Sequence, residues 1–235
     1  MNGSSIIVTG AAGSLGSALS MQAISAGLNT VMLDCDKKGL ESAYDLITDS
    51  GLPEPALYPM DLAGATPEHY QQLMETVSKE FGGLNGVVHC AARFEGLTPL
   101  EQFSPAEWLM QMQVNLNAAW LLSSCALPLL RESGAGRLYF MLENMSRMEG
   151  AFWGAYGVAK HSLKALVSQI AAETRTSGVQ VLGINPGPMR SPLRSLAYHS
   201  EDPESQPDPN IAAQHIMDLW FGKARPEGNF ADFSE

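Results

Sequence analysis

The stretch SIIVTGAAGSLG, residues 5–16, decides the fold of this chain. Four of its first five residues, Ile6 to Thr9, are apolar or β-branched, which predicts a short buried strand over residues 5–9. The glycines that follow permit a tight turn and a close approach of the backbone to a ligand. An apolar stripe that includes Leu15 and Leu19 then predicts a helix over residues 13–26. The stretch therefore predicts a strand, a glycine-rich turn and a helix in succession.

A glycine-rich turn at the start of a helix is typical of nucleotide-binding proteins. The first backbone N–H groups of the helix face outward there and bind phosphate. A structural turn would also use glycines, but the position between a strand and an amphipathic helix favours a nucleotide site. The candidate pyrophosphate-binding residues are Gly10, Gly13, Ser14, Leu15 and Gly16.

Outward from this turn, strand patterns and helix patterns alternate along the chain. Strands are expected at 5–9, 30–34, 56–61, 84–90, 137–142, 179–184 and 229–233. Helices are expected at 13–26, 37–48, 67–81, 105–131 (disturbed at Pro128), 155–176 and 211–221. Such alternation predicts parallel βαβ units with helices on both faces of the sheet and ligands at the carboxyl ends of the strands. Residues 186–210 hold six prolines and are expected to form a loop over the substrate site.

The composition excludes several classes of function. A net charge of −11, from 25 acidic and 14 basic residues without a basic cluster, argues against binding to nucleic acid or to an anionic membrane. Three cysteines without a CxxC pair predict neither a disulfide framework nor a metal site. The absence of a signal peptide and of a membrane-spanning run of about 20 apolar residues favours a cytoplasmic protein.

The ends of the second, third and fourth expected strands supply further candidate cofactor residues. Asp34 ends the second strand, where a carboxylate accepts hydrogen bonds from the adenosine ribose and repels a 2′-phosphate. This residue predicts NAD(H) as the preferred cofactor and NADP(H) as the less favoured one. Asp61, with Leu62, lies where it would reach the adenine, and Ala91 is small enough to leave room for the cofactor.

Tyr156 and Lys160 lie four residues apart near the start of the expected helix 155–176, so that both side chains share one face. An ammonium group beside a phenol favours the phenolate and lowers the pKa of the phenol. Such a tyrosine exchanges a proton with a carbonyl or alcohol oxygen. Lys160 would also hold the nicotinamide ribose. A YxxxK pair occurs often by chance, and its weight here comes from its place after the fifth strand.

These motifs together resemble the short-chain dehydrogenase/reductase family. The resemblance covers nearly the whole chain and rests on TGAAGSLG, Asp34, Asp61, HCAA at 89–92, VNL around Asn115, YGVAK at 156–160 and NPGPMRS at 185–191. Within the family, the segment from WGAYGVAK to NPG is most similar to the YciK-like oxidoreductases. The resemblance implies one Rossmann-type domain over residues 1–235, with a seven-stranded parallel sheet between two layers of helices.

The resemblance also implies the chemistry, which is hydride transfer between NAD(P)H and a carbonyl or alcohol. It makes Tyr156 the acid/base, Lys160 its electrostatic partner and Asn115 the holder of a proton-relay water. Pro186, Met189 and Ser191 would lie around the nicotinamide. The partners that it implies are a small carbonyl or alcohol substrate and further copies of the chain, in a homodimer or a homotetramer.

One departure from the family pattern concerns the reaction itself. The family places a serine thirteen residues before the tyrosine, and this chain has Glu143 there. An ionised carboxylate only accepts hydrogen bonds, and it disfavours a nearby phenolate. Two hypotheses follow. Either the chain is an oxidoreductase in which Glu143, Asn144 or Ser146 takes over the donor role, or it is a nucleotide-binding scaffold or sensor with little catalysis.

Overall fold

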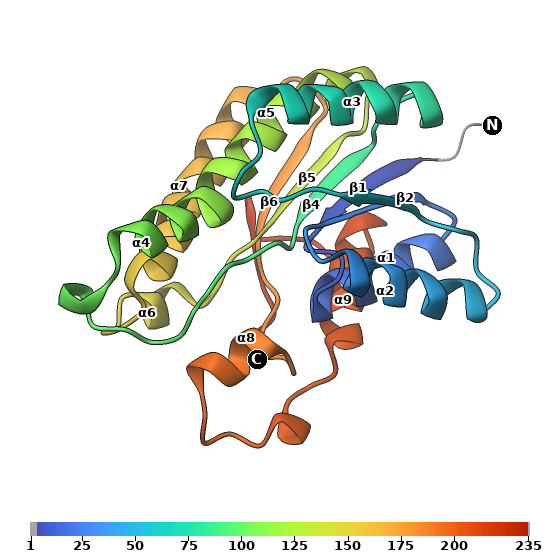
Figure 1. Ribbon diagram of the computed structural model, residues 1–235. Helices are drawn as coiled ribbons and strands as arrows, with labels where there is room; N and C mark the ends of the chain where they lie inside the picture. Colours follow the sequence, from blue (N-terminus) through green and yellow to red (C-terminus); the bar gives the residue numbers. More distant parts are fainter. Residues whose placement is uncertain (1–3, 235) are drawn as a thin grey trace.

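One parallel sheet of seven strands runs through the molecule (Figure 1), and the computed structural model describes residues 4–234. The strand order is β3-β2-β1-β4-β5-β6-β7. The strands are β1 (Ser5–Thr9), β2 (Asn29–Asp34), β3 (Ala56–Pro59), β4 (Gly86–His89), β5 (Arg137–Met141), β6 (Gln180–Asn185) and β7 (Phe230–Asp232). The order reverses beside β1, which pairs with β2 on one side and β4 on the other. Parallel sheets bind ligands at such a reversal.

Helices cover both faces of the sheet, which confirms the predicted three-layer fold (Figure 1). On one face lie α1 (Ser14–Ser25), α2 (Lys37–Asp49) and α9 (Pro209–Trp220), which share a core around Leu19, Leu40 and Ile216. On the other face lie α3 (Pro67–Phe81), α5 (Ala118–Glu132) and α7 (Gly154–Thr174). Because both faces are covered, β1 is buried at every position, as its run of apolar residues predicted.

The long helix expected at 105–131 is interrupted, but not at Pro128. It consists of α4 (Pro105–Met112), a π-helical turn (Gln113–Asn117) and α5, which continues through the proline. Pro128 and Ser124, whose carbonyl loses its usual partner, are both exposed, so water replaces the missing hydrogen bond. The π turn instead falls around Asn115, and such turns are frequent at functional sites.

The proline-rich segment 186–210 is more ordered than a loop. It contains α8 (Pro192–Ala197) and a 3₁₀ turn (Pro203–Ser205), and α9 begins at Pro209. Each of these three elements begins at a proline, and the residue before that proline, Ser191, Asp202 or Asp208, caps the element. Half of the six prolines that obscured any periodicity are therefore helix starts. The remaining short elements are a 3₁₀ turn (Leu100–Gln102) and α6 (Met145–Met148).

Candidate functional site

The glycine-rich turn joins β1 to α1 at the carboxyl end of the sheet. Gly10 has a φ of +66°, and a Cβ atom added there would lie 2.7 Å from the backbone of Ala91. A Cβ on Gly16 would lie 2.1 Å from the carbonyl oxygen of Gly10, so both positions require glycine. Gly13 caps α1 without a side-chain hydrogen bond, and the first turn of α1 contains no acidic residue. The first N–H groups of α1 are thus available to a phosphate.

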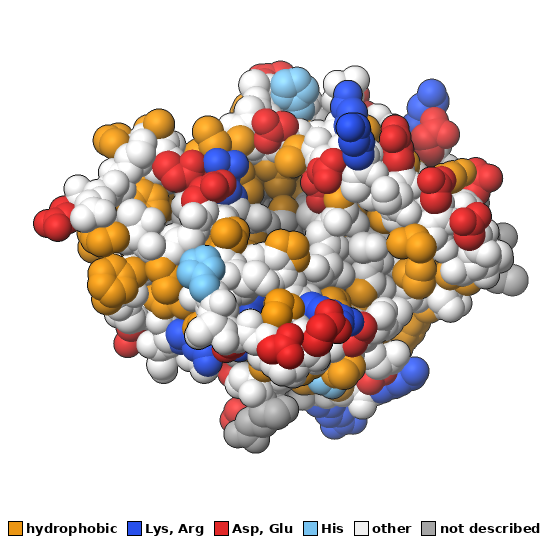
Figure 2. Space-filling view, turned by 60° about the horizontal axis from the view of Figure 1, so that its bottom comes forward, with side chains coloured by type: hydrophobic (Ala, Val, Ile, Leu, Met, Phe, Trp, Pro, Cys, Tyr) orange, Lys and Arg blue, Asp and Glu red, His pale blue; other side chains and the backbone are white. Residues whose placement is uncertain are grey.

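A cavity of about 320 Å³ extends from this turn to the start of α7. It brings together most of the predicted site residues: Gly10, Gly13, Ser14, Leu15, Gly16, Asp34, Glu143, Tyr156, Lys160, Pro186, Met189 and Ser191. Figure 2 turns this end of the molecule towards the reader and shows a hollowed face surrounded by acidic, basic and hydrophobic side chains. The segment after β6 closes one side of the cavity through Met189, Leu193 and Tyr198.

A second cavity of about 280 Å³ adjoins the first, because Gly10, Asp34 and Ala92 line both. Asp61, Leu62 and Ala91 line this second cavity and not the first. The two cavities therefore meet at the start of the glycine-rich turn. A dinucleotide has two such halves, one on each side of its pyrophosphate.

Glu143 and Tyr156 are in direct contact. The Tyr156 hydroxyl donates a hydrogen bond to Glu143 Oε1 over 2.8 Å, and the tyrosine is only 1% exposed. Burial, followed by the negative charge of Glu143, raises the pKa of the Tyr156 phenol well above its ordinary value. The spacing of Tyr156 and Lys160 predicted a lowered pKa for the tyrosine, and in the structure burial and Glu143 raise it instead.

Lys160 is buried like the tyrosine and reaches the end of β5. Its Nζ donates to the carbonyl oxygen of Met141 over 2.8 Å and lies 5.3 Å from the centroid of the Tyr156 ring. Burial lowers the pKa of Lys160, and the nearby Glu143 and Cys90 oppose that shift. The ammonium is therefore held at the end of β5, between the phenol and the sheet.

Asn115 lines neither cavity. Its side-chain amide accepts from the backbone N–H of Arg93 at 2.9 Å and donates to the Arg93 carbonyl at 2.8 Å. Both ends of the amide are used to hold the π turn against the segment after β4. The side chain predicted to hold a relay water thus bonds to the backbone in this structure.

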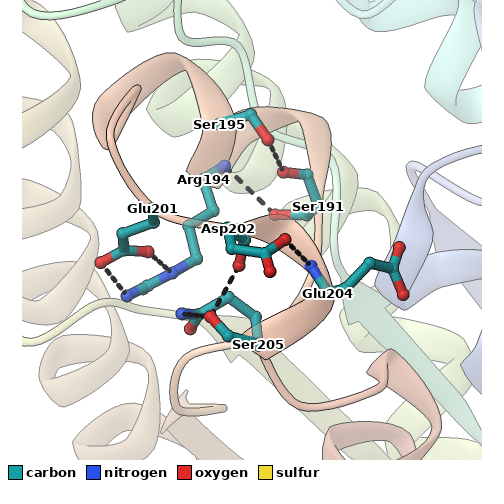
Figure 3. A network of polar contacts seen from close by, with 8 residues as sticks. Ser191, Arg194, Ser195, Glu201, Asp202, Glu204 and Ser205 are labelled. Atoms are coloured by element: carbon teal, nitrogen blue, oxygen red, sulfur yellow. Dashed lines mark hydrogen bonds and ion pairs between the residues drawn. The ribbon is translucent and has the colours of Figure 1, made fainter.

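The segment after β6 is fixed by its own polar contacts (Figure 3). Arg194 makes a two-pronged ion pair with Glu201, with distances of 2.7 and 2.9 Å, and its guanidinium lies 4.7 Å from the centre of the Tyr198 ring. The Ser191 side chain caps α8 by accepting from the backbone N–H of Arg194. These contacts place Arg194 and Tyr198 in the wall of the main cavity.

Sequence reasoning missed several residues of the main cavity. Arg147, Arg194 and Tyr198 line it, and none of the three was predicted to be a site residue. Arg147 lies in α6, four residues after Glu143, and this closeness gains meaning only once Glu143 is placed in the wall. Arg194 and Tyr198 lie in the segment where the prolines obscured the helix starts.

No helix within residues 4–234 is long and apolar enough to cross a membrane. Over the same range, no group of three or more His, Cys, Asp or Glu side chains is placed to hold a metal ion.

The profile of the short chain dehydrogenases matches residues 4–202, which is most of the chain. The chain belongs to the short-chain dehydrogenase family. It is 31% identical over 209 residues to the uncharacterized oxidoreductase YciK of Escherichia coli, covering 89% of this chain and 82% of YciK. The solved structure of Escherichia coli YciK has a TM-score of 0.87 and 29% identity, covering 97% of this chain and 93% of that one. The predicted family and the predicted YciK-like branch are confirmed.

Two further members of the family with solved structures carry a cofactor. A protein of Shigella flexneri described as a short chain dehydrogenase is complexed with NADP, at 30% identity and a TM-score of 0.88 over 97% of this chain and 96% of that one. A similarly described protein of Escherichia coli is complexed with NADPH, also at 30% identity and a TM-score of 0.88, over 97% and 95%.

These complexes make the predicted preference for NAD(H) wrong, because they point to NADP(H) instead. The prediction rested on Asp34 as a free acceptor for the ribose hydroxyls. In the structure both of its oxygens already accept backbone N–H groups, from Ala12 and from Asp36, each at 3.0 Å. The Asp34 carboxylate therefore stabilises the backbone around it. A carboxylate used in this way does not indicate which cofactor is bound.

Proposed function

We propose that the protein is an NADP(H)-dependent oxidoreductase that transfers a hydride between the nicotinamide and a small carbonyl or alcohol substrate. The observation that carries the proposal is the single cavity shared by the glycine-rich turn, Tyr156 and Lys160. Membership of the short-chain dehydrogenase family supports it. The NADP-bound relatives support the choice of cofactor.

The residues of the two cavities fit a dinucleotide. The uncapped start of α1 and the glycine-rich turn would hold the pyrophosphate. Asp61, Leu62 and Ala91 would contact the adenosine half, and Pro186, Met189 and Ser191 the nicotinamide half. Lys37 and Lys38, exposed at the start of α2, would face the 2′-phosphate. When bound, the cofactor supplies or accepts the hydride.

Tyr156 would act as the acid in carbonyl reduction. Its hydroxyl is protonated at neutral pH, as in an ordinary tyrosine, and burial and Glu143 raise its pKa further. To protonate a substrate oxygen, the hydroxyl must leave Glu143 Oε1 and turn to the substrate. Lys160 would hold the nicotinamide ribose from its place beside the Met141 carbonyl. The Asn115 side chain, through its bonds to Arg93, would position the π turn beside the site.

A second candidate function, that of a cofactor-binding scaffold or sensor, is favoured by one observation. The hydroxyl that should meet the substrate is bonded to Glu143, in the place of the family's serine donor. Loss of one such donor costs about 100- to 1,000-fold in rate, which reduces turnover and leaves part of it. The oxidoreductase is therefore preferred. A homodimer or homotetramer stays a prediction from the family resemblance, and a cytoplasmic location stays a prediction from the composition and patterns of the sequence.

The test is NADPH oxidation by the purified protein over a panel of aldehydes, ketones and quinones. The oxidoreductase turns over at least one of them, and Tyr156→Phe lowers that rate by about 100- to 10,000-fold. A protein that binds NADPH, yet consumes none with any compound, would be the scaffold. The Glu143→Ser variant then shows whether the carboxylate alone suppresses the reaction.

A further inference from the structure

Glu143 places a hydrogen-bond acceptor where a carbonyl substrate needs a donor. In the described structure the recorded hydrogen-bond donor to its carboxylate is the Tyr156 hydroxyl, which reaches one oxygen, Oε1. The residue lines the main cavity and is only partly buried. A carbonyl oxygen brought to this place would meet an oxygen that repels it.

A protonated nitrogen at the same place would be attracted by the Glu143 carboxylate. An N–H⁺ group donates to a carboxylate, and such charged hydrogen bonds are about twice as strong as neutral ones. The aromatic walls support a cation as well: Trp153 and Tyr156 line the cavity, and their ring centroids are 6.1 Å apart. The net charge of −11 adds a general attraction for cations.

Within residues 4–234, none of the positive side chains of the cavity makes a hydrogen bond or an ion pair to Glu143, although the charge of Lys160 lies close enough to interact with it. Lys160 donates to the Met141 carbonyl on the side of the sheet. Arg194 is neutralised by its two-pronged pair with Glu201 (Figure 3). Arg147 is exposed, and its guanidinium lies 5.5 Å from the centre of the Tyr198 ring.

From this geometry we infer that the substrate is a protonated imine, held by Glu143 through its N–H⁺ group and reduced to an amine. The inference rests on the proposed function, since the hydride comes from NADPH. The hydride forms the new C–H bond at the imine carbon, and the π electrons of the C=N bond become the lone pair of the amine nitrogen. NADPH is oxidised to NADP⁺. The substrate already carries its proton, so this step needs no proton from Tyr156, whose hydroxyl stays bonded to Glu143.

The test compares two bicyclic compounds of similar size, the imine 3,4-dihydroisoquinoline and the ketone 1-tetralone, in NADPH oxidation at neutral pH. The expected kcat/KM is at least tenfold higher for the imine. Glu143→Gln keeps the size of the side chain and removes its charge, and it should lower the imine-to-ketone ratio at least tenfold. Glu149→Gln, in the same segment but outside the cavity lining, is the matched control and should keep the ratio. An equal preference in the unmodified protein, or an unchanged ratio in Glu143→Gln, overturns the inference.

A binding measurement separates this inference from the proposed function. In calorimetric titrations of the protein, the amine 1,2,3,4-tetrahydroisoquinoline, a cation at neutral pH, should bind more tightly than the neutral alcohol 1-tetralol. Glu143→Gln should weaken the binding of the amine by roughly 10- to 100-fold and leave the binding of the alcohol nearly unchanged. Equal binding of the two compounds refutes the cation site even if ketones are reduced. Selective amine binding without any NADPH oxidation supports the cation site and overturns the hydride transfer on which the reduction depends.

Discussion

At the scale of single residues, the contact between Glu143 and Tyr156 governs the account. The sequence identified both residues, and it also indicated that a carboxylate would disfavour the phenolate. It could not show that the two side chains bond over 2.8 Å, because that distance depends on the loop that follows β5. The pKa of Tyr156 is raised where the motif predicted a lowered value, and the reason is similar. The spacing of the YxxxK motif says nothing about burial, or about the Met141 carbonyl that Lys160 contacts.

This contact predicts a pH dependence. Alcohol oxidation needs the phenolate of Tyr156, so its rate rises as pH approaches the pKa of that group. Because Glu143 raises this pKa, Glu143→Gln should lower it and move the rise to lower pH, while burial keeps the pKa above its ordinary value. The measurement is kcat/KM for alcohol oxidation against pH. Glu149→Gln should leave the profile in place, and an unmoved profile in Glu143→Gln would contradict the assigned cause.

At the scale of elements, the strands and most helices could be predicted from periodicity, and the exceptions have physical reasons. Pro128 lies on an exposed helix face, where water replaces the missing bond. The π turn is held by side-chain bonds from Asn115 to the distant Arg93 backbone, a contact that no local pattern reveals. In the segment after β6, prolines begin short elements, although the sequence argument interpreted them as a loop.

The start of α2 carries a prediction about the cofactor. If Lys37 and Lys38 face the 2′-phosphate, replacing both with alanine should weaken the binding of NADPH about tenfold or more. The binding of NADH should change little, because NADH lacks that phosphate. Fluorescence titration with each cofactor measures both affinities. Lys79→Ala, an exposed lysine near the end of α3, is the control. Equal losses for the two cofactors would show that the lysines do not select NADPH.

At the scale of the whole molecule, the alternation of strands and helices was enough to predict one three-layer domain with its site at the carboxyl ends of the strands. The packing of that domain was not predictable, because it depends on pairs distant in sequence. Gly86 in β4 lies under Trp220 at the end of α9: a Cβ added to Gly86 would lie 2.2 Å from the Trp220 ring and 3.0 Å from the Arg137 carbonyl. A glycine is required there by a helix more than a hundred residues away.

Gly86→Ala should therefore destabilise the protein by about 1–3 kcal/mol, since the ring must move away from the sheet. Denaturant unfolding followed by tryptophan fluorescence measures the change in the free energy of unfolding. Gly64→Ala is the matched control, because no atom lies within 4 Å of a Cβ added there. If the two variants lost the same stability, the packing of Trp220 on β4 would not be as described.

The measurement that tests the central claim most directly follows the hydride itself. NADPH that carries deuterium at both C4 positions is incubated with the protein and with 1-tetralone or 3,4-dihydroisoquinoline, and the products are analysed by mass spectrometry. We expect one deuterium on the former C=O or C=N carbon of at least one product. If the protein bound NADPH but transferred deuterium to neither compound, that result would contradict an oxidoreductase acting on these two bonds.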